Sequence, residues 1–114
     1  MDPNTLHILW TNDNPITAEH MVFMYATNSL LKKWWGDVHL IVWGATTKLL
    51  CENAMLREKV RVFQKAGGHV SACKRCAENL GVLEELERIP GIEILYIGEN
   101  FTRILKSGEK IITI

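Results

Sequence analysis

The stretch Val38-His39-Leu40-Ile41-Val42-Trp43 decides the fold of this chain. It is apolar at almost every position, and Gly44 ends it. A strand with one face in water alternates apolar and polar residues, whereas a strand buried on both faces is a continuous apolar run. We therefore expect residues 38–43 to form a strand inside a parallel sheet.

Similar apolar runs recur along the chain and alternate with segments of helical periodicity. The predicted strands are residues 6–10, 38–43, 69–72, 92–97 and 110–114. The predicted helices are residues 16–35, 46–53, 54–66, 74–80, 82–88 and 100–106. Because this alternation is typical of βαβ units, we predict a single three-layer α/β/α domain over residues 1–114 with a mainly parallel five-stranded sheet.

Length and charge limit the possible functions. The 114 residues suffice for one hydrophobic core, and 13 basic residues balance 13 acidic ones, so the formal net charge is zero. This balance argues against broad electrostatic binding to nucleic acid or to an anionic membrane. Residues 1–5 lack the pattern of a secretory signal, and no apolar run reaches membrane-spanning length. We expect a cytoplasmic protein with reduced thiols.

The parallel sheet itself predicts where a site lies. Ligands of open α/β sheets bind beyond the carboxyl ends of the strands. The residues expected to line such a cleft are Thr11, Asn12, Asp13, Gly44, Thr46 and Glu99, with Cys73 after the third strand. The sequence has no dinucleotide-binding, P-loop, serine-hydrolase or zinc-protease motif, and we predict no cofactor.

Cys73 is the candidate reactive residue. It lies where the third strand meets the first turn of a helix, and Lys74 and Arg75 follow it. Free backbone N–H groups and positive charge favour a thiolate, which is the nucleophilic form of cysteine. The alternative is that Cys73 is a small buried apolar residue at a strand end.

The other two cysteines have different interpretations. Cys76 completes a C-x-x-C motif with Cys73. Because residues three apart share a helix face, the two sulfurs could form a reversible disulfide. The alternative is that Cys76 packs against the sheet. Cys51 has no catalytic neighbour and is expected in the core. A metal site at His69, Cys73 and Cys76 stays open, although structural zinc needs a fourth ligand.

The first helix carries two apolar stripes. One contains Ala18, Val22, Tyr25, Ala26, Ser29 and Leu30 and is expected to face the core. Met24, Leu31 and Trp35 lie roughly opposite. A chain of this size has little protein to cover a second stripe, so we predict a homo-oligomer that uses these three residues.

Five stretches, in this order, carry a family resemblance. They are Leu9-Trp10-Thr11-Asn12-Asp13; Trp34-Trp35-Gly36-Asp37-Val38; Leu40-Ile41-Val42-Trp43-Gly44; Ala72-Cys73-Lys74-Arg75-Cys76-Ala77 with Leu80-Gly81-Val82; and Leu105-Lys106-Ser107-Gly108. On these residues the chain resembles the DsrE/DsrF-like family of small sulfur-relay proteins. The resemblance implies an α/β fold, a trimer or hexamer, and transfer of sulfur as a cysteine persulfide. The family's acceptor cysteine matches Cys73, whereas Cys76 has counterparts only in some branches.

Three hypotheses follow. The leading one is a persulfide carrier that uses Cys73, stabilises the anion with Lys74 and Arg75, and has donor and acceptor proteins or small thiols as partners. At most this is a sulfurtransferase-type activity. The second is a thiol–disulfide redox protein that uses Cys73 and Cys76. The third is a non-catalytic module that binds a small ligand or a partner.

Overall fold

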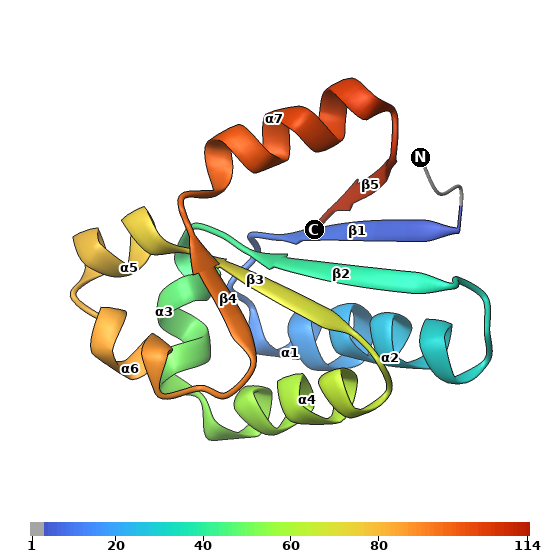
Figure 1. Cartoon of the computed structure of the whole chain (residues 1–114). Helices are drawn as coiled ribbons and strands as arrows, with labels where there is room; N and C mark the ends of the chain where they lie inside the picture. The colour runs from blue at the N-terminus through green and yellow to red at the C-terminus, as the bar shows by residue number, and fades with distance from the viewer. Residues whose placement is uncertain (1–3) are drawn as a thin grey trace.

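Five parallel strands form one sheet in the order β4-β3-β2-β1-β5, as the computed structural model of residues 4–114 shows (Figure 1). The strands are β1 (Thr5–Trp10), β2 (Asp37–Val42), β3 (His69–Cys73), β4 (Ile92–Leu95) and β5 (Lys110–Thr113). The two longest apolar runs, β1 and β2, are neighbours in the middle of the sheet. The parallel pairing of all five strands confirms the predicted sheet. The runs of β1 and β2 are apolar throughout because central strands have both faces covered.

The first helical segment is interrupted. Asn14 caps α1 (Pro15–Thr17), accepting from the N–H groups of Ile16 and Thr17 at 2.8 and 3.1 Å. The π-helical segment η1 (Ala18–Phe23) and α2 (Met24–Leu31) follow. The predicted continuation to residue 35 is wrong, since Lys33 takes a left-handed φ of 58° that ends the helix.

The later helices lie close to the predicted ranges. They are α3 (Ala45–Glu52), α4 (Ala54–Lys65), α5 (Lys74–Leu80), α6 (Leu83–Glu87) and α7 (Ile97–Ser107). In α4 the residues Leu56, Val60 and Phe63 are fully buried, as their spacing predicts. Helix α7 begins three residues earlier than its apolar pattern suggested, directly after β4.

Helices cover the two faces of the sheet unequally. Figure 1 shows α7 alone over one face, whereas α2, α3 and α4 pack on the other. The larger core lies on the α2–α4 face and includes Trp10, Leu40 and Phe63. The smaller core lies under α7 and consists of Leu9, Ile41, Cys73 and Ile97. Cys73 therefore lies on the face of the sheet that α7 alone covers.

Candidate functional site

Cys73 lies at the carboxyl end of β3 and is the residue before α5. Its side chain is only 4% exposed and packs with Leu9, Ile41 and Ile97 beneath α7. The backbone there is extended, with φ −73° and ψ 113°. Both interpretations of Cys73 thus have support, because it occupies the strand-end position and is also part of a small apolar core.

Cys76 approaches Cys73 from the first turn of α5. Its main-chain N–H donates to Cys73 Sγ at 3.4 Å. Burial raises the pKa of the Cys73 thiol, a hydrogen bond with the Cys76 side chain raises it further, and the N–H groups of Cys76 and Arg75 oppose this. The net direction is opposite to the shift expected from the basic neighbours. The two free thiols are nevertheless together at one strand end.

The basic pair next to Cys73 points toward an aromatic ring. Lys74 Nζ and Arg75 Cζ each lie 5.4 Å from the centroid of the Tyr96 ring. The Tyr96 hydroxyl donates to the Glu78 carboxylate at 3.1 Å, and Arg75 Nε lies 3.7 Å from the same carboxylate. The two cations thus face Tyr96 and Glu78, and burial is the largest influence on the pKa of Cys73.

The residues expected to line a strand-end cleft are not all available for binding. Thr46 is completely buried, and its hydroxyl donates to the Trp10 carbonyl at 2.7 Å, so it joins strand ends rather than lining a cleft. Gly44 precedes α3 with a φ of 73°. The remaining four, Thr11, Asn12, Asp13 and Glu99, are exposed at their predicted positions.

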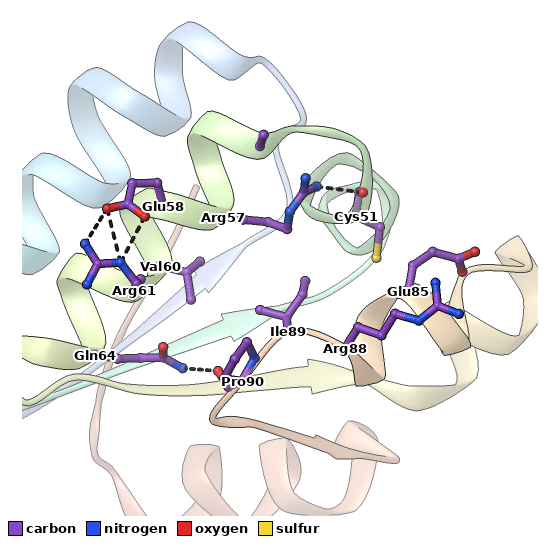
Figure 2. A pocket seen from close by; sticks show the side chains of 11 residues that line it. Cys51, Arg57, Glu58, Val60, Arg61, Gln64, Glu85, Arg88, Ile89 and Pro90 are labelled. Carbon is purple, nitrogen blue, oxygen red and sulfur yellow. Dashed lines mark hydrogen bonds and ion pairs between the residues drawn. The ribbon is translucent and has the colours of Figure 1, made fainter.

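Cys51 packs against the larger core, as predicted, but it is not enclosed by it. It is half-buried at the end of α3 and lines a hollow between α4 and α6 (Figure 2). Its Sγ lies 3.9 Å from the Val82 carbonyl. Burial, and then the nearby Glu85 carboxylate, raise the pKa of this thiol. The sequence around Cys51 did not reveal the hollow because α6 comes from a distant part of the chain.

His69 does not join the cysteines. It begins β3, whereas Cys73 ends that strand, so the two are on the order of 13 Å apart along an extended chain. His69 Nε2 instead lies 3.3 Å from an Asp37 carboxylate oxygen. In residues 4–114 no group of three or more His, Cys, Asp or Glu side chains is arranged to hold a metal ion.

A line of polar side chains under α7 was missed by sequence reasoning. His7 Nδ1 lies 2.8 Å from His39 Nδ1, His7 Nε2 lies 3.2 Å from Glu109, and His39 Nε2 lies 2.7 Å from the Ser71 hydroxyl. With both rings neutral, one proton arrangement satisfies all three contacts. Ser71 donates to His39, His39 Nδ1–H donates to His7, and His7 Nε2–H donates to Glu109.

The register of the strands creates this line. His7 pairs with His39 between β1 and β2, and His39 pairs with His69, two residues before Ser71, between β2 and β3. Ser71 and Cys73 are two residues apart and share the α7 face of β3. The alternation of side chains within each strand indicates only which residues share a face of the sheet. The pairing register is needed to show that these side chains meet.

The predicted oligomer stripe is partly corrected. Met24 and Leu31 are 51% and 64% exposed. Trp35 is half-buried outside the helix, and its indole N–H donates to the Tyr25 hydroxyl at 3.1 Å. Its neighbour Trp34 is the exposed tryptophan, at 53%. The helix ends before these residues, and so helical spacing placed the wrong tryptophan at the surface.

None of the helices within residues 4–114 combines the length and the apolar character needed to cross a bilayer.

Comparisons with known proteins identify similar structures. A conserved protein of unknown function, BT1422 from Bacteroides thetaiotaomicron, is 38% identical over 97% of this chain and 95% of that one, with a TM-score of 0.93. The ychN protein from E. coli (13% identity, 96% and 97% coverage, TM-score 0.72) shares the fold. So does MTH1491, a protein of unknown function from Methanobacterium thermoautotrophicum (14% identity, 96% and 98% coverage, TM-score 0.74).

No protein-family model and no curated protein matches the sequence. The shared fold agrees with the fold that the DsrE/DsrF-like resemblance implies.

Proposed function

The chain belongs to the same family as the conserved Bacteroides thetaiotaomicron protein BT1422, and we propose that it carries sulfane sulfur on Cys73. One observation supports this proposal above the others: two reduced thiols meet at the carboxyl end of β3, where the Cys76 N–H donates to Cys73 Sγ. That N–H favours negative charge on a sulfur at this position. The resemblance to sulfur-relay proteins supports the same assignment.

The transfer is a thiol exchange that needs no external oxidant. The Cys73 thiolate attacks the outer sulfur of a donor persulfide, R–S–SH. The donor S–S bond breaks, a new S–S bond forms to give Cys73–S–SH, and the donor leaves as the thiolate R–S⁻. An acceptor thiolate then removes the outer sulfur by the same reaction and returns Cys73 to its thiolate form.

Cys76 provides a second exit for the sulfur. Its thiolate attacks the inner sulfur of Cys73–S–SH, giving a Cys73–Cys76 disulfide and releasing HS⁻. A dithiol reductant then restores both thiols and is itself oxidised to a disulfide. This step depends on the closeness of the two sulfurs, which is supported by the packing of Cys76 against the small core that contains Cys73.

Burial limits which partners suit Cys73. With 4% of its surface exposed, its thiol is reached by a compact donor more readily than by the active-site loop of another protein. Among donor and acceptor proteins and small thiols, we therefore favour a small-thiol persulfide. The exposed ring of Tyr96, together with Lys74 and Arg75, borders the approach to the strand end.

The test is intact-protein and peptide mass spectrometry after exposure to glutathione persulfide. We expect one added sulfur atom on the peptide that contains Cys73, retained in Cys51→Ser and lost in Cys73→Ser. Cys76→Ser should retain the adduct longer, because the internal release step is gone. A protein that gains no sulfur, or gains it equally in Cys73→Ser, would contradict the proposal.

The proximity of Cys76 to Cys73 also favours a second candidate, a reversible Cys73–Cys76 redox pair. This function predicts loss of two hydrogen atoms on titration with a disulfide oxidant and a defined reduction potential. The persulfide carrier instead predicts a gain of sulfur. The same mass spectra distinguish the two.

Self-association is the third part of the proposal. We propose a homo-oligomer that uses Met24 and Leu31, with Trp34 taking the place of Trp35. Light scattering at micromolar concentration tests it: a trimer or hexamer that dissociates in Leu31→Glu supports the proposal, and a monomer rejects it.

A further inference from the structure

The hollow that contains Cys51 lies on the side of the sheet away from α7 and therefore away from Cys73 (Figure 1). Its volume is about 470 Å³, within the usual range of small-molecule sites. Side chains from α4 and α6, together with the turn before β4, form its walls (Figure 2). The persulfide proposal makes no use of this hollow.

Arg57 gives the hollow a fixed positive charge. Its Nη1 donates to the Leu50 carbonyl at 3.2 Å and to the Cys51 carbonyl at 2.8 Å, which holds the half-buried guanidinium against the end of α3. These partners are neutral carbonyls. Within residues 4–114, Arg57 has no carboxylate partner at ion-pair distance, so its charge is not neutralised by the chain.

Arg88, the residue after α6, supplies a second cation. It is exposed, and in the described part of the chain no ion pair engages it. Figure 2 shows the sulfur of Cys51 between the Arg57 and Arg88 guanidiniums in this view. Arg61, a third arginine of the lining, is already bound by Glu58. Glu85 also lines the hollow and opposes binding of an anion.

The rest of the lining is apolar except for Gln64, whose side-chain amide donates to the Pro90 carbonyl at 3.0 Å. Val60 is fully buried at the base, and Ile89 and Pro90 contribute hydrocarbon surface from the turn after α6. A ligand that fits these surfaces combines a compact anionic head with a short hydrocarbon tail. Guanidinium groups bind carboxylates and phosphates in a planar fork, and because Glu85 opposes added negative charge, the singly charged carboxylate is the head group that suits this site.

We propose that this hollow binds a short-chain organic monocarboxylate, with its carboxylate at Arg57 and Arg88 and its alkyl chain on Ile89 and Pro90. Binding is non-covalent and separate from Cys73. Cys51 borders the bound carboxylate, and the ligand therefore shields this thiol from solvent reagents. This proposal does not depend on whether Cys73 transfers sulfur.

The test titrates hexanoate into the full chain and follows backbone amide shifts by NMR. We expect saturable shifts at Cys51, Arg88 and Ile89 with a dissociation constant of about 1 mM. Arg88→Gln, at an exposed position, should weaken binding about fivefold, and Glu85→Gln should tighten it because it removes a repelling carboxylate. Hexanol, which lacks the charge, should bind more weakly than hexanoate.

A second readout uses the thiol. Saturating hexanoate should slow alkylation of Cys51 by iodoacetamide, whereas Cys76, which is half-buried outside the hollow, should react at an unchanged rate. Shifts that do not saturate, an unchanged affinity in Arg88→Gln, or equal slowing of both thiols would overturn the proposal. Cys73→Ser should bind hexanoate normally, so a failed persulfide assay does not affect this result.

Discussion

His7 and His39 share a hydrogen bond between their Nδ1 atoms at 2.8 Å, across the central strands β1 and β2. One of the two nitrogens must donate and the other accept, so the contact requires that at least one ring be neutral. Burial, followed by the charges of His7 and His69, lowers the pKa of His39 from 6.5 to about 4. His39 is thus neutral at physiological pH.

The folded protein should lose stability in mild acid because of His39. Its pKa is lower in the folded chain than in the unfolded one, so unfolding takes up a proton between the two values. The contribution is complete above the unfolded value and is lost as the pH falls through the folded value. Asp37 and Glu109 nearby reduce this effect. We expect the free energy of unfolding to fall by up to about 3 kcal/mol between pH 7 and pH 4.

Urea unfolding followed by tryptophan fluorescence measures this dependence. His39→Gln removes the titrating group and keeps hydrogen-bonding capacity toward His7 and Ser71, so its stability should vary less over the same pH range. An equal pH dependence in the wild type and in His39→Gln would show that other groups control the acid response.

Gly68 should not tolerate a side chain. A Cβ at this position would lie 2.3 Å from Cζ of the buried Phe63 ring, which has no free space to move into. Gly68→Ala is therefore expected to cost about 1–3 kcal/mol of stability. Gly98→Ala is the matched control, since its Cβ would meet nothing within 4 Å on α7 and alanine favours a helix. Comparable midpoints of thermal unfolding for the two variants would contradict this account.

Two adjacent buried threonines should respond oppositely to the same substitution. The Thr46 hydroxyl donates to the Trp10 carbonyl at 2.7 Å, whereas the Thr47 hydroxyl has no partner in the described structure. Thr46→Val should lower stability by about 1 kcal/mol, because it removes this hydrogen bond and leaves the Trp10 carbonyl with only the longer bond, 3.3 Å, from the Trp43 N–H. Thr47→Val should be neutral or stabilising. Chemical denaturation of both variants tests the difference, and the reverse order would refute the hydrogen-bond assignment.

The three thiols should react with iodoacetamide at different rates. Burial raises the pKa values of Cys73 and Cys51, and Cys73 is also nearly inaccessible. We expect Cys76 to be alkylated first and Cys73 last in time-resolved mass spectrometry. If Cys73 reacts first, Lys74 and Arg75 control its charge more strongly than burial does.

Much of the fold could be predicted from the sequence, because each element carries a local signal. The apolar run 38–43, the Asn14 cap and the buried stripe of α4 all lie where their residue types predict. The π-helical segment η1 and the left-handed Lys33 have no such signal, so the end of the first helix was misplaced.

The site was less predictable, because its properties depend on contacts between distant segments. The position of Cys73 follows from the strand order. Its burial under α7 and the contact of Lys74 with the Tyr96 ring do not follow from it. The His7–His39 contact likewise depends on strand register. The hollow at Cys51 depends on where α6 packs.

Sulfur transfer through Cys73 is tested by the mass of the Cys73 peptide after exposure of the reduced protein to glutathione persulfide, followed by addition of a thiol acceptor. We expect one added sulfur on Cys73 that the acceptor removes, with Cys51→Ser unaffected. No adduct on Cys73, or an adduct that the acceptor cannot remove, would contradict it.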